Sequence, residues 1–271
     1  GDVKKIVDIL TEKGHTYEQD GAIWFKAEQF GADKDFVLVR SNGVPTYVVP
    51  DIAYHYNKLV TRGFDTAVDV LGADHHGYVP RLKAALKALS INPDRLRVVL
   101  MQMVRLVRNG EAVKLSKRSG KAITLVTLLD EVPIDAARFI FNLREPNTHC
   151  EFDLDLAVEQ SGENPVYYVQ YAHARICSIL KNLAAEGISP KEMNKKELDA
   201  LTCDEEIELI RHLGALTGEI TEAAEALDPS KITKYAVELA TLFHKFYNSC
   251  RVRCDDEGLM YARLQLCLCT K

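Results

Sequence analysis

The sequence predicts an α/β domain followed by an all-α helical bundle, and three patterns in its 271 residues support this fold class. Three short apolar runs alternate with stretches in which apolar residues recur at helical spacing. The order strand, helix, strand, helix, strand is typical of a parallel sheet with crossover helices. From about residue 125 onward, apolar residues keep the helical period almost throughout, which indicates a bundle.

The first segment predicts a short helix and a hairpin. Residues 3–13 have a helical pattern. In residues 17–25, the pair Asp20-Gly21 separates two alternating runs, which is the strongest local signal for a β-hairpin. We expect this hairpin, near residues 15–30, to be a small covering element.

The predicted strands of the parallel sheet are residues 36–39, 66–71 and 96–100, and its crossover helices are residues 51–62 and 78–89. Ligands of parallel sheets bind beyond the carboxyl ends of the strands. The polar segment at residues 72–77, which contains Asp74, His75 and His76, directly follows the second strand. It is therefore a candidate ligand site.

The helical part contains two long apolar stripes, at residues 163–183 and 233–250. An earlier helical pattern around residues 128–143 ends where residues 144–147 interrupt it. The pairs Ser189-Pro190 and Asp228-Pro229 are the clearest turns between helices, because proline favours the first turn of a helix.

Composition and charge exclude several classes of protein. No apolar run approaches the roughly 20 residues of a membrane span, and the first residues lack the apolar core of a secretion signal. The formal charge of −5 argues against indiscriminate DNA coating. We therefore expect a cytoplasmic protein with no membrane and no DNA partner, and we expect a monomer.

The cysteines indicate reduced thiols. There are seven, an odd number, and several lie within apolar helical patterns, which argues against a disulfide framework. Cys250, Cys254, Cys267 and Cys269 lack the double Cys-x-x-Cys spacing of a zinc site. We expect no metal site.

Positive charge is concentrated in residues 105–121, where six basic residues accompany the single acid Glu111. Lys114 and Lys117, three positions apart around Ser116, can place ammonium groups on neighbouring phosphate oxygens. A polyanion such as a nucleotide triphosphate is one partner that suits this segment, and solvated basic surface is the alternative.

Four segments, taken in order, resemble the motifs of the arginyl-tRNA synthetases, which are class I aminoacyl-tRNA synthetases. They are residues 46–55 (TYVVPDIAYH), 72–78 (GADHHGY), 113–120 (VKLSKRSG) and 164–175 (NPVYYVQYAHAR). The third is similar to the Lys-Met-Ser-Lys-Ser loop that holds ATP phosphates, with Leu115 in place of methionine. The similarity runs from about residue 15 to the end of the sequence.

The resemblance implies a division into three parts. Residues 1–125 would form the second part of a Rossmann-type nucleotide-binding catalytic domain. Residues 126–155 would form a connector that contacts the tRNA stem, and residues 156–271 an α-helical anticodon-binding domain that is truncated at its end.

The resemblance also implies an activity, that of an arginine-tRNA ligase in protein biosynthesis. ATP with Mg²⁺ and arginine would form arginyl-adenylate, and the arginyl group would pass to tRNA(Arg). The substrate carboxylate attacks the α-phosphorus, so the enzyme needs only to position the reactants and neutralise charge.

Site residues follow from the same resemblance. The catalytic candidates are Lys114, Ser116, Lys117 and Arg118. The ATP-binding candidates are Met103, Val104, Lys114, Leu115, Ser116 and Lys117. The arginine-binding candidates are Tyr47, Asp51, Asp74, His75 and His76. The tRNA-binding candidates are Tyr168, Tyr171, Arg175, Lys245, Asn248 and Arg251.

The chemistry of the proposed arginine site agrees with the residue types, because a carboxylate can accept two donors of a guanidinium while a tyrosine offers a face or a hydroxyl. The alternatives are structural. Asp51 could simply begin a helix, Tyr47 could be a core aromatic, and Asp74 with its neighbours could cap a loop. Met103 could fill a core, and the tyrosines of residues 164–175 could be buried in the bundle.

The family's His-x-Gly-His type loop does not occur in this sequence. We therefore expect a fragment whose residues 1–271 alone have little or no adenylate-forming activity, and we expect Asp51 and Lys117 to face a common cleft. A non-catalytic tRNA-binding paralogue and another class I synthetase are the alternatives.

Overall fold

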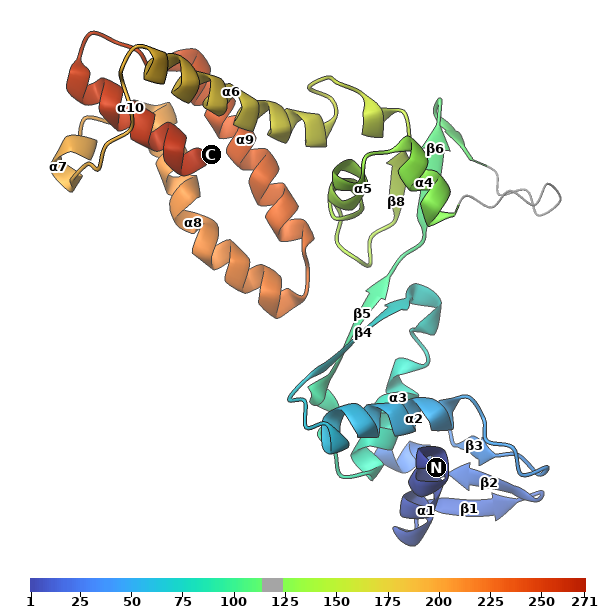
Figure 1. Ribbon diagram of the computed structural model, residues 1–271. Coiled ribbons are helices and arrows are strands. Elements are labelled where there is room, and N and C mark those ends of the chain that lie inside the picture. Colours follow the sequence, from blue (N-terminus) through green and yellow to red (C-terminus); the bar gives the residue numbers. More distant parts are fainter. Residues whose placement is uncertain (114–123) are drawn as a thin grey trace. The chain divides into compact units, whose positions relative to one another are not determined.

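The computed structural model describes residues 1–113 and 124–271, which form two compact units, Gly1–Met103 and Val104–Lys271 (Figure 1). The first unit contains helices α1 (Asp2–Glu12), α2 (Val48–Tyr56) and α3 (Val79–Ala88), and strands β1 (Thr16–Gln19), β2 (Ala22–Phe25), β3 (Phe36–Val39), β4 (Ala67–Gly72) and β5 (Leu96–Met101). Short 3₁₀ turns lie at Ala27–Phe30, Ala73–His75 and Pro93–Arg95, and a π-turn at Asn57–Thr61 extends α2.

Strands β1, β2 and β3 form an antiparallel sheet in that order. The predicted hairpin is confirmed: Asp20 and Gly21 have φ values of 53° and 72°, as a tight turn with two left-handed residues requires. The prediction that residues 36–39 belong to the parallel sheet is wrong, because β3 pairs with β2 instead. A run of four apolar residues fits either sheet, and β2, which precedes it along the chain, offers it a free edge.

Strands β4 and β5 form the predicted parallel pair, in register from Ala67 opposite Leu96 to Gly72 opposite Met101. Helix α3 connects them, as a parallel pair requires. Helix α2 lies against α1 and α3 (Figure 1), and the apolar faces of these elements form one core around Leu38, Ile52 and Leu86, all fully buried.

The second unit begins with a small sheet in the order β7-β6-β8, formed by β6 (Val104–Arg108), β7 (Glu111–Ala112) and β8 (Cys150–Asp153). Strand β6 is antiparallel to β7 and parallel to β8. Helices α4 (Leu125–Glu131) and α5 (Ile134–Phe141) pack with this sheet around the buried Phe152. Pro133 separates the two helices, within the segment predicted as one helical pattern.

The rest of the second unit is the predicted helical bundle. It comprises a 3₁₀ turn (Leu156–Val158), α6 (Pro165–Ala185), α7 (Lys195–Leu198), α8 (Asp204–Ala226), α9 (Ser230–Ser249) and α10 (Glu257–Thr270). Asn164 caps α6 by accepting a 3.0 Å hydrogen bond from the backbone of Val166, ahead of Pro165 in the first turn. Helix α9 packs against α6 and α8 through the fully buried Phe243 and Phe246.

Among the described residues, no helix is long and apolar enough to cross a lipid bilayer. All seven cysteines lie in described segments and are free thiols.

Candidate functional site

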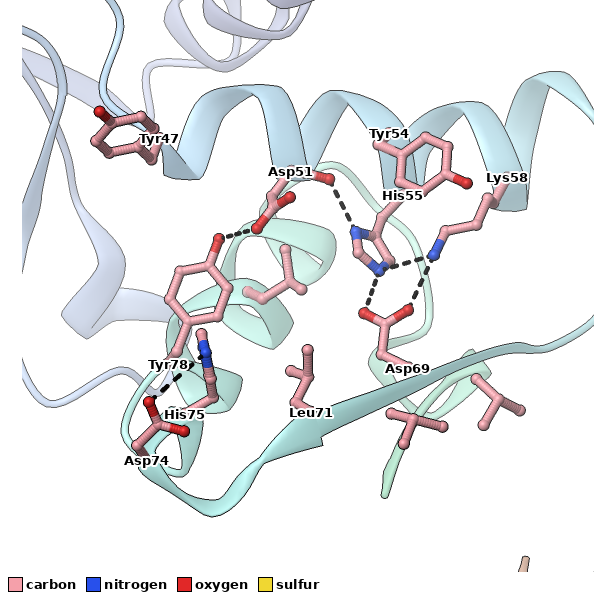
Figure 2. A pocket seen from close by; sticks show the side chains of 13 residues that line it. Tyr47, Asp51, Tyr54, His55, Lys58, Asp69, Leu71, Asp74, His75 and Tyr78 are labelled. Carbon is pink, nitrogen blue, oxygen red and sulfur yellow. Dashed lines mark hydrogen bonds and ion pairs between the residues drawn. The ribbon is translucent and has the colours of Figure 1, made fainter. Parts of the chain in front are cut away.

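A pocket of about 660 Å³ opens in the first unit where α2, strand β4 with the turn that follows it, and the start of α3 meet (Figure 2). Its polar lining residues are Tyr47, Asp51, Tyr54, His55, Lys58, Asp69, Asp74, His75 and Tyr78. It therefore lies at the carboxyl end of a parallel strand, where the topology predicts a ligand site.

Asp51 lies in the first turn of α2, and its side chain is held by a residue from another element. The hydroxyl of Tyr78 donates a 2.6 Å hydrogen bond to Oδ2 of Asp51. Burial, followed by this hydrogen bond and the charge of Asp51, raises the pKa of Tyr78. The phenol therefore stays protonated and donates, and Asp51 keeps the lone pairs of Oδ1 for a further donor.

Tyr47 immediately precedes α2 and is 90% exposed, so it is not a core aromatic. Figure 2 shows it at the same end of the pocket as Asp51, one helical turn away. A phenol ring and a carboxylate thus line the same pocket near the N-terminal end of α2. Asp51 is at once a residue of the first helical turn and a pocket residue, so the two roles considered for it coexist.

A second network lies deeper along α2. His55 is 4% exposed, and its Nδ1 donates to the backbone oxygen of Asp51 at 2.8 Å, because a carbonyl oxygen only accepts. Its Nε2 lies 2.7 Å from Oδ2 of Asp69 on β4, and Nζ of Lys58 contacts Oδ1 of the same carboxylate at 3.0 Å. The carboxylate of Asp69 on β4 thereby fixes the side chains of His55 and Lys58.

The charges of the pocket favour a cationic ligand. Three carboxylates line it, those of Asp51, Asp69 and Asp74, whereas Lys58 is its only permanently charged base. The Lys58 ammonium and the Asp69 carboxylate pair with each other. Two carboxylates, those of the exposed Asp51 and Asp74, remain for a cationic ligand.

Of the five predicted arginine-binding residues, Tyr47, Asp51, Asp74 and His75 line this pocket, and His76 does not. Nε2 of His75 lies 3.9 Å from Oδ2 of Asp74. Sequence reasoning missed further polar lining residues, namely Tyr54, His55, Lys58, Asp69 and Tyr78. Two signals were available: His55 and Lys58 follow Asp51 at helical spacing, and Asp69 interrupts an apolar strand.

The predicted ATP-binding and catalytic residues are distributed differently. Lys114, Leu115, Ser116, Lys117 and Arg118 lie outside the described residues. Met103 is 80% exposed at the end of the first unit, so it does not fill a core, and Val104 begins β6 in the second unit. A cleft shared by Asp51 and Lys117 stays a prediction.

The tRNA-binding candidates of α6 belong to an aromatic cluster with α9. The guanidinium of Arg175 lies 4.7 Å from the ring centre of Tyr171 and 4.5 Å from that of Tyr247. It also donates to the Tyr171 hydroxyl at 3.0 Å and to Nδ1 of His244 at 3.2 Å. Arg175 is thus held between two tyrosine rings, one from each helix.

Tyr168 differs from its neighbours, because it packs partly against the helical core and its ring lies 4.8 Å from that of His244. The alternative that the tyrosines of residues 164–175 pack into the bundle therefore applies in part to Tyr168. Lys245, Asn248 and Arg251 are exposed at the end of α9. The last two line a pocket of about 480 Å³ between α6 and α9.

Two protein families match the chain. Residues 2–180 match the family described as tRNA synthetases class I (R), catalytic domain, and residues 169–271 match the DALR anticodon binding domain. The arginine–tRNA ligase of Caldanaerobacter subterraneus is 56% identical over 271 residues, which are 100% of this chain and 48% of that protein. The arginine–tRNA ligase of Acetivibrio thermocellus is 53% identical over 98% of this chain and 47% of its own length.

Solved structures agree. An arginyl-tRNA synthetase structure from Campylobacter jejuni has a TM-score of 0.84 at 34% identity and covers 99% of this chain and 58% of its own. The arginyl-tRNA synthetase of Thermus thermophilus, at 22% identity, has a TM-score of 0.84 over 100% of this chain and 55% of its own, which is a likeness of fold. The chain spans about half the length of the curated relatives that it matches.

Proposed function

The chain belongs to the class I (R) family of tRNA synthetases, and from this premise we propose that it supplies the arginine-binding pocket and the anticodon-binding domain of an arginine–tRNA ligase. The observation that carries the proposal is the acidic pocket at the N-terminal end of α2, where Asp51 and Tyr47 lie together. The reaction would activate arginine with ATP and transfer it to tRNA(Arg). Another class I synthetase is disfavoured by the match to the arginine type.

Asp51 would accept the guanidinium of arginine. Tyr78 occupies Oδ2 as a donor and fixes the plane of the carboxylate, which leaves Oδ1 for a charge-assisted hydrogen bond. Tyr47, exposed beside it, would offer its ring or hydroxyl to the planar cation. Asp74 and His75 would contact the polar part of arginine, and His76 has weaker support because it does not line the pocket.

ATP would be held by the basic segment and by the end of the first unit. The motif alone supports the assignment of the phosphate contacts, which would come from Lys114, Ser116 and Lys117. Leu115 and Arg118 would lie beside them. Met103 and Val104 would meet the adenine through their backbone groups. Mg²⁺ would arrive with ATP as part of the substrate and not in a protein cage of its own.

The tRNA would bind the helical bundle through the cluster around Arg175. Two tyrosine rings beside a cation suit the stacking of unpaired bases and the contact with a phosphate. Tyr171 is exposed enough to stack, whereas the half-buried Tyr168 would act through His244, whose ring lies 4.8 Å from its own. Lys245, Asn248 and Arg251 would contact the tRNA backbone or a base in the adjacent pocket.

The domain organisation that we propose places catalytic residues in 1–125, a stem-contact connector in 126–155 and the anticodon-binding domain in 156–271. We also propose a cytoplasmic protein that acts as a monomer. Because the sequence has no His-x-Gly-His loop, the 271 residues alone should form little arginyl-adenylate. A pyrophosphate-exchange assay with tRNA present tests this, and near-normal turnover would contradict it.

Arginine binding by the chain tests the central proposal directly. Equilibrium dialysis with labelled arginine should show competition by unlabelled arginine and about tenfold weaker competition by citrulline, the neutral isostere, because only a cation gains from the carboxylates. Asp51→Asn should remove this preference, whereas the exposed Asp65→Asn should keep it. Equal competition by arginine and citrulline in the unmodified chain would refute the proposal.

A further inference from the structure

Two cysteines from opposite ends of the α8–α9 hairpin meet beside a buried ion pair. Cys203 precedes α8 and Cys250 follows α9. The sulfur atoms of Cys203 and Cys250 and a carboxylate oxygen of Glu206 all lie within 4.8 Å of one another. Nothing in the proposed reaction uses these residues, so their proximity needs its own explanation.

The ion pair between Glu206 and Arg263 holds both cysteines in place. Nε of Arg263 donates to Oε1 of Glu206 at 2.7 Å, and Oε2 of Glu206 accepts the backbone N–H of Cys203 at 2.9 Å. On the other side, Nη1 of Arg263 donates to the backbone oxygen of Arg251 at 2.8 Å, next to Cys250. Since Glu206 is fully buried, this arrangement is fixed from within the bundle.

A metal ion suits this cluster poorly. Both oxygens of Glu206 already accept hydrogen bonds. Nη2 of Arg263 lies 3.8 Å from the sulfur of Cys203. A metal ion bound to this sulfur would therefore be repelled by the permanently charged guanidinium. The same cation suits a negatively charged sulfur, which is the reactive form of a cysteine.

We propose that Cys203 and Cys250 form a dithiol that low-molecular-weight disulfides oxidise reversibly to an intramolecular disulfide. Both residues lie at helix ends in extended backbone, with φ and ψ of −69° and 148° for Cys203 and −115° and 105° for Cys250. The two sulfur atoms already lie within 4.8 Å of each other, so rotation of the two side chains at these helix ends is the movement that the roughly 2.0 Å of a disulfide requires. This inference is independent of the proposed ligase function.

The two cysteines have different parts in the exchange. Cys203 is half-buried and faces Arg263, so its thiolate attacks one sulfur of the small disulfide and releases the first small thiolate. Cys250 is buried, and desolvation, followed by the hydrogen bond and charge of Cys203, raises the pKa of its thiol to about 12. In the mixed disulfide the sulfur of Cys203 carries no charge, which removes its part of the raised pKa of Cys250, while burial, the largest cause, remains.

Cys250 then loses its proton and attacks the sulfur of Cys203, which releases the second small thiolate. Two protein thiols are oxidised to one disulfide, and one small disulfide is reduced to two thiols, which take up the two protons. The disulfide between Cys203 and Cys250 would covalently link the start of α8 to the end of α9.

A peptide map of the native chain tests the proposal without any substitution. The 271-residue chain is treated with oxidised glutathione, alkylated and digested with trypsin, which places Cys203 in residues 197–211, Cys250 in 246–251 and Cys254 in 254–263. The amount of the disulfide-linked peptide pair 197–211 and 246–251 should exceed that of every other disulfide-linked pair about tenfold. The reason is that the proximity of the two cysteines sets the rate at which Cys250 attacks the mixed disulfide. In concentrated urea this preference should disappear.

Three variants separate the steps. Cys250→Ser should trap the glutathione adduct on Cys203, Cys203→Ser should leave Cys250 unmodified, and Cys254→Ser should form the link as the unmodified chain does. Circular dichroism establishes that each variant is folded. A dominant link to Cys254, adducts without a link in the unmodified chain, or one equivalent of zinc bound by the reduced chain and lost in Cys203→Ser would overturn the proposal.

Discussion

The hydroxyl of Tyr78 donates a 2.6 Å hydrogen bond to Oδ2 of Asp51, across 27 positions of sequence. The bond joins the first turn of α2 to the residue that precedes α3. It orients the exposed carboxylate to which we assign the guanidinium of arginine. In the proposed arginine site, Tyr78 would therefore be a positioning residue that acts on the ligand through Asp51.

Replacement of Tyr78 by phenylalanine should weaken arginine binding about fivefold, or roughly 1 kcal/mol, because the carboxylate loses its fixed orientation while the ring is kept. Tyr54→Phe is the matched control, since Tyr54 lines the same pocket and no hydrogen bond of its hydroxyl is described. Equilibrium dialysis measures both affinities. The role of Tyr78 is contradicted if the two variants bind arginine equally well.

The carboxylate of Asp69 should be important for stability. It pairs with His55 and Lys58, both largely buried, so Asp69→Asn would leave a buried ammonium without its counter-charge. We expect a loss of about 1–3 kcal/mol in the free energy of unfolding of the first unit. Urea titration measures it. Asp65→Asn, at an exposed side chain, should change the same quantity by less than about 0.5 kcal/mol.

Much of the fold could be predicted because its signals are local. The hairpin at Asp20-Gly21, the parallel pair β4–β5 and the long helices all have a clear period or turn signal. The assignment of β3 failed because a short apolar run does not specify its partner strand. Strands β6, β7 and β8 were not predicted, since they are short and charged residues interrupt their apolar pattern.

The part of the candidate site that lies within the sequence motifs was predicted. Tyr47, Asp51, Asp74 and His75 stand in contiguous segments that resemble a family, so they could be identified one by one. The structure adds hydrogen bonds between residues of different elements, which involve Tyr78, His55 and Asp69. Such pairs are visible only in three dimensions. The same holds for Tyr247, which encloses Arg175 from a different helix.

The ion pair of Glu206 and Arg263 yields a further prediction. Glu206→Gln keeps the shape of the side chain but leaves the guanidinium buried without a counter-charge, which should cost about 3–5 kcal/mol of the stability of the bundle. The exposed Glu208→Gln on the same helix should cost less than about 0.5 kcal/mol. Urea unfolding of the two variants gives both values, and equal values would show that the pair is not a structural anchor.

His244 should make the stability of the bundle depend on pH. Desolvation, followed by the charge of Arg175, lowers the pKa of His244 in the folded chain from its ordinary value of 6.5. Its Nδ1 accepts from Arg175, so the neutral ring carries its proton on Nε2, and a second proton would have to go onto Nδ1, which faces the guanidinium. The unfolded chain therefore binds more protons than the folded chain as the pH falls below 6.5.

Stability contributed by neutral His244 should thus be complete above pH 6.5 and decline as the pH falls toward the lower pKa of the folded state. Urea titrations across this range should show the decline in the unmodified chain and a smaller one in His244→Gln. His173→Gln, which changes an exposed histidine on α6, should keep the decline of the unmodified chain. If His244→Gln and His173→Gln gave parallel curves, groups other than His244 would control the pH dependence, and the contact between Arg175 and Nδ1 would have no part in it.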